Sequence, residues 1–482
     1  MRAGRGLPKA SGAKLVVLKY LALDSGNDTR EMELKQLVFL GLTVIFIPVA
    51  AWFGIRYRWA ERLLVAGAVF STCYLIDINF VSMEWYRGDT KGFEFGVTDW
   101  MIISLMIVMA RAPRWKSKRP ELLPPNSSLM LVYFILAMFT IFIAYVPVYA
   151  GFGVFKILRA MAVYWVAYNY LRSEEDLRFF VTVLAAMVAF QFLLVMKDRI
   201  GGIYRATGST PHSNTLAMYI NMMNMIFLSF VLGDVQGGRR RYLYWGALGM
   251  GTLIVLATFS RGALAMMVFG YGLVTLLSAY DRPSLRKFKV VGLMLLAALP
   301  LVIRVAPAII ERFESAPVGA EVSRHQANDA AYAMAKDNFF GVGLNNYSHV
   351  INETGYVRFI PLESDRGIVH NIYYLHASEM GWIGLLLFLL MIGNFILMAA
   401  RYILRRQDDI TSWMAIGIFV GMVTLWMQSA LEWAFRQTYI TVEFFLLAGF
   451  LAALPRLERA MRRERRARKL QQAWLAQGRR PG

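Results

Sequence analysis

Residues 379–399 read EMGWIGLLLFLLMIGNFILMA, and Glu379 is the only charged residue among them. An α-helix needs about 20 apolar residues to cross the hydrocarbon core of a bilayer. The stretch has this length and is apolar on all sides, whereas a transmembrane β-strand alternates apolar and polar residues over about ten positions. It therefore predicts a membrane-spanning α-helix, and similar stretches decide the class of the whole chain.

Apolar runs of comparable length recur along the chain as far as residue 455. They predict about thirteen spans, at residues 35–54, 62–81, 97–110, 128–148, 152–171, 178–196, 213–232, 242–259, 262–280, 288–306, 379–399, 412–433 and 438–455. We expect an all-α integral membrane protein with twelve to thirteen transmembrane helices and no internal repeat. The runs divide the chain into an N-terminal arm (1–34), a first group of transmembrane helices (35–306), a long external loop (307–378), C-terminal transmembrane helices (379–455) and a basic tail (456–482).

The composition supports this class. Among the 482 residues, 57% are hydrophobic and only 17% are charged, against about 25% charged residues in soluble proteins. The 52 Lys and Arg residues exceed the 32 Asp and Glu residues and give a net charge of +20. Because these basic residues stand between apolar spans, they do not indicate a nucleic-acid partner.

The positions of the basic loops predict the orientation, since Lys and Arg favour the cytoplasmic side of short loops. Alternation of the spans places the most basic segments on that side: the tail and the loops around Arg111, Arg239, Arg282 and Arg401. The opposite side then carries the turn at Arg205, the turn at Arg261, the connection Glu432–Arg436 and the long loop 307–378.

Polar residues on this second side are the candidates for chemistry, because charges inside or beside a membrane are costly and tend to be functional. Three places stand out. The first is Tyr204–Asn214, where Gly and Pro predict a turn and Ser213 or Asn214 could cap the next helix. The second is Thr258–Gly262, which ends one span and starts another. The third is the loop from Arg324 to Glu379.

Several of these residues together resemble a known family. The turn Ser260-Arg261-Gly262, the stretch from Arg324 to Gly341-Val342-Gly343, and the run His370-Asn371 to Glu379-Met380-Gly381 look like the bacterial O-antigen ligase and O-antigen polymerase family of membrane glycosyltransferases. The resemblance covers about residues 200–400. It implies a multi-spanning (GT-C-like) fold in the bacterial inner membrane. It also implies transfer of a glycan from an undecaprenyl-diphosphate carrier to an acceptor hydroxyl on the periplasmic face, as in lipopolysaccharide biosynthesis.

The residues suit this chemistry. A guanidinium group is always charged and offers a planar fork of donors to phosphate oxygens. We therefore predict that Arg205 and Arg261, with Arg324, hold the diphosphate, which leaves once its charge is stabilised. Histidine titrates near neutral pH, so His370, where the long loop meets the membrane, is the candidate general base. Asn371, Glu379 and His212 are predicted to support the site, with Glu379 orienting His370 or lying at a helix N-terminus.

Each of these residues also has an ordinary structural interpretation. Arg261 could be an interfacial anchor, Arg205 a loop charge and Arg324 a salt-bridge partner. Lys156 and Arg159, near the outer end of the fifth predicted span, either extend the phosphate site or reach toward lipid headgroups. Asp77, inside the second predicted span, could pair with one of these cations or mark a polar path, and the sequence does not identify its partner.

Other patterns bear on cofactors and on rival functions. No His, Cys and Asp cluster has metal-ligand spacing, so the sequence favours an enzyme that needs no metal or cofactor. A single displacement by a base-activated hydroxyl, with no evident covalent nucleophile beside His370, would make it an inverting enzyme. The acceptor could be lipid A-core, another surface glycan, the end of a repeat unit (a polymerase) or a protein side chain. A polytopic lipid or solute transporter is the alternative from another class, although such folds tend to show two related halves.

Overall fold

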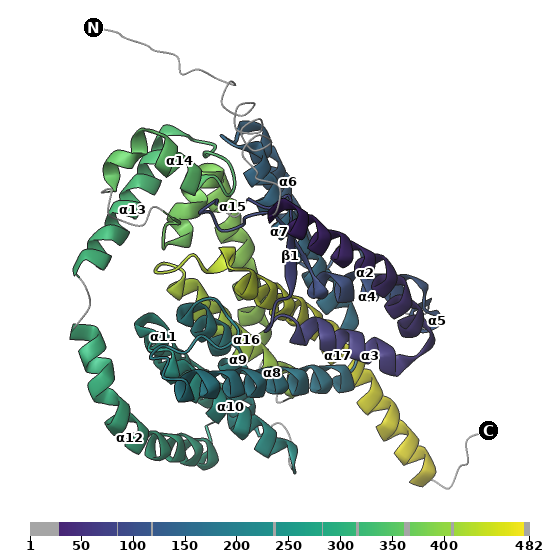
Figure 1. The fold of residues 1–482 in the computed structure, drawn as a ribbon. Coiled ribbons are helices and arrows are strands. Elements are labelled where there is room, and N and C mark those ends of the chain that lie inside the picture. The colour runs from purple at the N-terminus through teal and green to yellow at the C-terminus, as the bar shows by residue number, and fades with distance from the viewer. Residues whose placement is uncertain are drawn as a thin grey trace.

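The computed structural model describes residues 28–476 except positions 84, 117–118, 235–237, 282, 315–317, 361–366 and 406–408. Most of the predicted N-terminal arm, nine residues of the predicted loop and the end of the tail therefore lie outside the described residues. The chain folds almost entirely into helices, which pack into one body with α12 along its outer edge (Figure 1). The predicted all-α membrane class is confirmed.

The N-terminal half contains ten helices and one β-hairpin within its described residues. They are α2 (Asp28–Arg56), α3 (Arg58–Phe70), β1 (Asp77–Phe80), β2 (Phe93–Gly96), α4 (Val97–Arg111), α5 (Pro113–Lys116), α6 (Ser127–Ile143), α7 (Pro147–Tyr170), α8 (Glu174–Ile200), α9 (Ser213–Gly233), α10 (Arg240–Ala257) and α11 (Arg261–Asp281). The remaining elements are α12 (Leu285–Glu314), α13 (Val318–Asp337), α14 (Tyr347–Glu353), η1 (Gly355–Phe359), α15 (Ile372–Ile403), α16 (Ile410–Gln428), η2 (Ala434–Arg436) and α17 (Thr438–Ala476).

Eight helices among the described residues are long and apolar enough to cross a membrane, and each overlaps a predicted span. They are Leu34–Arg56, Pro147–Tyr170, Glu174–Ile200, Ser213–Gly233, Arg261–Tyr280, Ile372–Ile403, Ile410–Gln428 and Thr438–Ala467. The predicted spans 97–110, 128–148 and 242–259 coincide with α4, α6 and α10, which are shorter or more polar, and 288–306 lies within α12. The predicted number of twelve to thirteen spans therefore includes segments that are too short or too polar to count as membrane-crossing helices by length and apolar composition.

The predicted span 62–81 is wrong as one continuous helix. Helix α3 has 13 residues and ends at Phe70, which gives about 20 Å at 1.5 Å per residue and is too short to cross the bilayer core. The chain then becomes extended, and β1 pairs with β2 in antiparallel register, Asp77 opposite Gly96. Asp77 therefore lies in a hairpin and not inside a helix.

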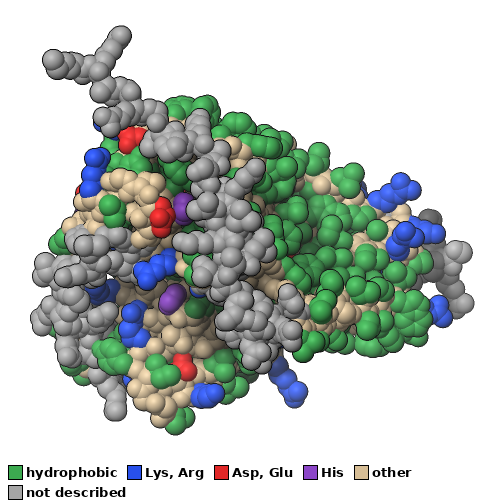
Figure 2. Space-filling view, turned by 45° about the horizontal axis from the view of Figure 1, so that its top comes forward, with side chains coloured by type: hydrophobic (Ala, Val, Ile, Leu, Met, Phe, Trp, Pro, Cys, Tyr) green, Lys and Arg blue, Asp and Glu red, His purple; other side chains and the backbone are tan. Residues whose placement is uncertain are grey.

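The core is centred on α9, whose residues are nearly all buried and which packs against α10, α11 and α16. Helix α17 packs against α7 and α16, and α15 packs against α6, α13 and α16. Figure 2 shows a broad hydrophobic surface on the right of the view, with Lys and Arg side chains at its far end. At the left is a mixed surface with basic, acidic and histidine side chains. This pattern fits a bilayer-facing band between two polar ends.

Local sequence features fix the helix ends that matter below. The side chain of Asn371 accepts hydrogen bonds from the backbone N–H groups of Tyr373 and Tyr374 and so caps α15. Helix α15 then bends at Gly381, whose φ of +70° is accessible to glycine and strained for other residues. On the opposite end of the body, Ser173 and Asp176 form a capping box at the start of α8.

Candidate functional site

A cavity of about 370 Å³ lies where the loops of the predicted external side converge. Its walls come from the α8–α9 loop, the α10–α11 turn, α13 and the end of α16. The lining residues are Arg205, Asn214, Phe259, Ser260, Arg261, Gly262, Ala265, Arg324, Gln428, Leu431 and Glu432. We call it the Glu432 cavity. It brings together all three arginines predicted from the sequence, and with one carboxylate among its lining residues it carries net positive charge.

Glu432 connects the groups around the cavity. One carboxylate oxygen, Oε1, accepts a hydrogen bond from Nδ2 of Asn214 at 2.5 Å and lies 3.9 Å from the Arg324 guanidinium. The other, Oε2, lies 3.4 Å from Nδ1 of His370. The Glu432 side chain is only 8% exposed, whereas those of Arg324 and His370 are each 45% exposed. A buried carboxylate thus positions two groups that remain accessible to a ligand.

Arg205 is held in a fixed orientation. Its Nη2 donates to Oδ1 of Asn214 at 2.7 Å, and its Nε donates to the carbonyl oxygen of Thr258 at 3.2 Å. Asn214 therefore bridges Arg205 and Glu432. The prediction that Ser213 or Asn214 caps the next helix is wrong, because α9 begins at Ser213 with His212 in the cap position.

Arg261 is the first residue of α11, and α10 ends only four residues earlier at Ala257. The turn between them includes Phe259 in the left-handed region, at φ +48°. Unpaired N–H groups and the helix dipole favour an anion at a helix N-terminus. Arg261 and the N-terminus of α11 thus both lie at the cavity, and both favour a bound anion there.

Glu379 belongs to a different cluster from the one predicted. It is 3% exposed, and its Oε2 pairs with Nη2 of Arg436 at 2.5 Å, while its Oε1 accepts from the backbone N–H of Tyr347 at 3.1 Å. The prediction that Glu379 orients His370 is therefore wrong. The carboxylate beside His370 is that of Glu432, and Glu379 lies inside α15, two residues before its bend.

The glycine-rich element of the long loop packs on that bend. Backbone N–H groups of Val342 and Gly343 donate to the carbonyl oxygens of Ser378 and Glu379, both at 2.9 Å. Gly341 has φ +85°, and a Cβ there would lie 2.3 Å from the Glu379 carbonyl oxygen. Two segments that the resemblance singled out are therefore in direct backbone contact. The glycines act as a tight turn, with Gly341 and Gly343 both at positive φ.

The two remaining supporting residues are not at the cavity wall. Asn371 caps α15 and so fixes the helix that follows His370. His212 is exposed just before α9 and is not among the residues that line the Glu432 cavity.

Lys156 and Arg159 point into the protein and do not reach toward headgroups. The Lys156 ammonium donates to the Arg436 carbonyl oxygen at 2.6 Å and lies 3.8 Å from Asp89. Arg159 lies within 3.4 Å of Asp77 and also pairs with Glu94 and Asp99. The cationic partner of Asp77 is thus Arg159. Burial raises the pKa of Asp77 to about 6 despite this partner.

The comparison with protein families identifies part of the chain. Residues 245–389 match the model of a family described as O-antigen ligase. This segment belongs to the O-antigen ligase family. A comparison with curated proteins finds no match. The family relationship supports a function of the O-antigen ligase or polymerase type, a membrane-bound enzyme that in general acts on lipid-linked glycan.

The O-antigen ligase segment contains Arg261, Arg324 and His370, all of which reach the cavity region. Arg205 and Glu432 lie outside it, on the preceding and following parts of the chain, and complete the same cavity. Sequence reasoning missed Glu432, although an acidic residue directly after the apolar run of α16 was a usable signal. Within the described ranges, no group of three or more His, Cys, Asp or Glu side chains could hold a metal ion.

Proposed function

We propose that this protein transfers a glycan from an undecaprenyl-diphosphate carrier to an acceptor hydroxyl of lipid A-core or another surface glycan. The reaction takes place on the periplasmic side of the bacterial inner membrane, at the Glu432 cavity. The observation that carries this proposal is the convergence of Arg205, Arg261 and Arg324 with a His370–Glu432 pair on the face opposite the basic loops. The family match supports it.

The arginines would hold the diphosphate. Breaking the sugar–phosphate bond leaves a strongly anionic diphosphate, and donors already in position stabilise that charge without rearranging in the transition state. Arg205 is oriented by Asn214 and Thr258, so its guanidinium is set before substrate binds. Arg261 adds charge at the start of α11. No proton needs to reach this leaving group.

His370 would accept the proton of the acceptor hydroxyl. With Nδ1 directed at Glu432, Nε2 is the nitrogen that can face the acceptor. The acceptor oxygen forms a bond to the anomeric carbon, the bond from that carbon to the diphosphate oxygen breaks, and the diphosphate keeps the electron pair. A single displacement of this kind inverts the anomeric configuration. The Glu432 carboxylate fixes the imidazole and stabilises its charged form, as the carboxylate does in a catalytic triad.

Replacing His370 with alanine is expected to lower glycan transfer by about 100-fold or more, the usual contribution of a general base. The protein, reconstituted in liposomes, is given a lipid-diphosphate glycan and candidate acceptors, and the products are separated by gel. A shift of lipid A-core indicates a ligase, a ladder on the carrier indicates a polymerase, and a shift of a polypeptide indicates protein glycosylation. His325→Ala, an exposed histidine of α13, is the matched control. Transfer by His370→Ala at the wild-type rate would rule out the general-base role.

Replacing Arg261 with lysine tests the diphosphate role separately. Lysine keeps the positive charge but loses the planar fork of donors, so we expect about a tenfold or greater loss of transfer in the same assay. Arg401→Lys serves as the control, because Arg401 is exposed at the end of α15 and does not line the Glu432 cavity. Equal activity of Arg261→Lys and wild type would favour the interfacial-anchor interpretation.

A further inference from the structure

Phe339 and Phe340 lie exposed between α13 and the turn at Gly341, in the segment that the sequence predicts as a long external loop. Their side chains are 57% and 49% exposed, respectively, and their ring centroids are 5.3 Å apart. We call these two residues the phenylalanine pair. A contiguous group of exposed apolar side chains marks an interaction surface, so the question is which partner covers this pair.

The phenylalanine pair is held at a fixed level of the helices beside it. The carbonyl oxygen of Phe339 accepts a hydrogen bond from the backbone N–H of Trp382, just after the bend of α15, at 3.3 Å. The ring of Phe340 lies 6.1 Å from the ring of Phe139, near the end of α6. The pair is therefore tied to α15 on one side and to α6 on the other.

The length of α15 places this level relative to the membrane. Arg401 is exposed in the last turn of α15, where a charged side chain reaches out of the hydrocarbon core. Gly381 lies 20 residues before it, and none of the residues between them is charged. These residues rise about 30 Å, which is the thickness of the core. With Arg401 at one boundary of the core, Gly381 and the phenylalanine pair lie at the opposite boundary.

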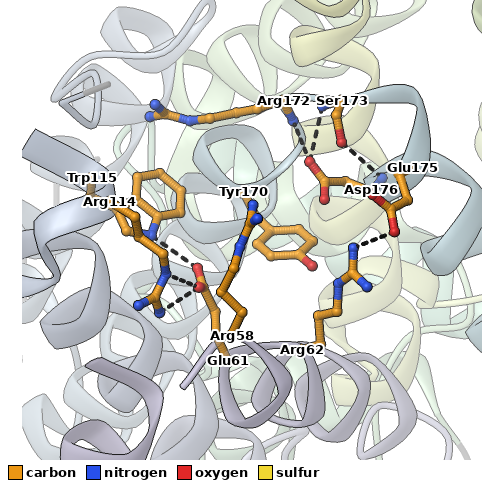
Figure 3. A pocket seen from close by; sticks show the side chains of 10 residues that line it. All are labelled: Arg58, Glu61, Arg62, Arg114, Trp115, Tyr170, Arg172, Ser173, Glu175 and Asp176. Carbon is orange, nitrogen blue, oxygen red and sulfur yellow. Dashed lines mark hydrogen bonds and ion pairs between the residues drawn. The ribbon is translucent and has the colours of Figure 1, made fainter. Parts of the chain in front are cut away.

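At the other end of the molecule, charged side chains mark the boundary. Arg62 lies 2.7 Å from Glu175 and Arg114 donates to Glu61 at 2.5 Å, around α3, α5 and the start of α8 (Figure 3). Helix α8 leads from this charged level to the loop that contains Arg205 and has 27 residues, a length of about 40 Å. This length fits a bilayer with both headgroup layers, which is about 40–45 Å thick.

The phenylalanine pair continues the apolar surface of two helices. Exposed apolar side chains recur at helical spacing on each of them: Val132, Ile135, Phe139 and Phe142 on α6, and Ile383, Leu386, Leu390 and Leu397 on α15. No charged residue occurs between positions 127 and 143 or between 380 and 400. Phe139 belongs to the α6 row and contacts Phe340. The pair is therefore continuous with a surface that suits lipid.

We propose that Phe339 and Phe340 insert into the bilayer leaflet on the predicted external side and so place the end of α13 at its surface. Phenylalanine is among the residues that interfacial segments bury at the boundary between headgroups and acyl chains. Lys336 and Asp337, exposed directly before the pair, would lie among the headgroups. The partner is thus the lipid bilayer, and this contact is independent of the proposed glycan transfer.

Spin labelling of the full-length protein in nanodiscs tests this proposal. Cys73 is the only cysteine and is buried, so a nitroxide attaches selectively to a cysteine introduced as Phe340→Cys. Collisions with oxygen, which concentrates in lipid, are compared with collisions with a water-soluble nickel chelate. Leu390→Cys, nine residues beyond the bend of α15, is the bilayer reference. Glu353→Cys, exposed at the end of α14, is the aqueous reference.

We expect the ratio of oxygen to nickel collisions at Phe340→Cys to lie well above the ratio at Glu353→Cys and below the ratio at Leu390→Cys. A ratio equal to that at Glu353→Cys would place the pair in water and overturn the proposal. Low collision rates with both reagents would also overturn it, because a second copy of the chain would then cover the pair. Phe339→Cys gives the same measurement if Phe340→Cys does not fold.

Discussion

Replacing Glu432 with glutamine is expected to lower glycan transfer by about 100-fold or more while the protein still folds. Glutamine has nearly the same size, and its side-chain oxygen can still accept from Asn214. It loses the negative charge that faces Arg324 and His370. Without that charge the imidazolium formed during proton transfer is not stabilised, and removal of the orienting carboxylate in a catalytic triad has a large cost in turnover. The measurement is the initial rate of transfer in proteoliposomes.

The control for this variant is Glu353→Gln. Glu353 ends α14, is exposed and belongs to the same polar part of the chain as His370. It should transfer glycan at close to the wild-type rate. If Glu432→Gln retained more than about half of the wild-type activity, the carboxylate would have a structural role only, and His370 would have to act without it. A size-exclusion profile of each variant separates loss of activity from loss of folding.

Most of the membrane helices could be predicted because their signal is local. A run of about 20 apolar residues is sufficient to specify a membrane helix whatever surrounds it. The same applies to the turn at Arg261, where a single Ser-Arg-Gly sequence between two apolar runs leaves room for only one connection. Arg205, Arg261 and Arg324 were placed on one face by the alternation of spans, and the structure brings them to one cavity.

The hairpin of β1 and β2 could not be predicted in this way. Residues 62–81 are apolar enough to resemble a span, but the interior of the protein offers Asp77 and its neighbours a buried cation, Arg159, from α7. That partner is 82 residues away in sequence. Contacts between distant segments decide whether such a run remains helical, and no local pattern contains them.

A contact between distant segments also explains why Glu379 was predicted to have the role that Glu432 has in the structure, beside His370. Glu379 is closer to His370 in sequence than Glu432 is, which made it the natural candidate to orient the imidazole. In the structure the positive φ at Gly381 breaks α15, and Glu379 faces Arg436. Glu432 reaches His370 because the α16–α17 connection folds back over the start of α15, where the Ile372 N–H donates to the Ser429 carbonyl oxygen at 3.0 Å.

Arg436 is the centre of the buried network below this connection. Its guanidinium contacts Glu379 at 2.5 Å and lies 3.9 Å from Asp89, and its carbonyl oxygen accepts from Lys156. Burial alone would lower the pKa of Arg436, but the carboxylates of Glu379 and Asp89 outweigh it, so the pKa is raised. The network joins the β1–β2 connection, α7, α15 and η2, and it supports the turn that carries Glu432.

Replacing Arg436 with methionine is therefore expected to destabilise the protein severely. Methionine fills part of the space but leaves Glu379 buried without its cation, while Asp89 keeps only Lys156, and removing one partner of a buried ion pair costs about 3–5 kcal/mol. We expect a lower unfolding temperature and a smaller yield of monodisperse protein in detergent. Arg459→Met, an exposed arginine on α17, is the matched control. Combining Arg436→Met with Glu379→Gln should recover part of the loss, because it removes the uncompensated charge of Glu379. An Arg436→Met protein as stable as the wild type would mean that the network contributes nothing to folding, and the position of Glu432 would then have to depend on its own contacts with Asn214 and Arg324.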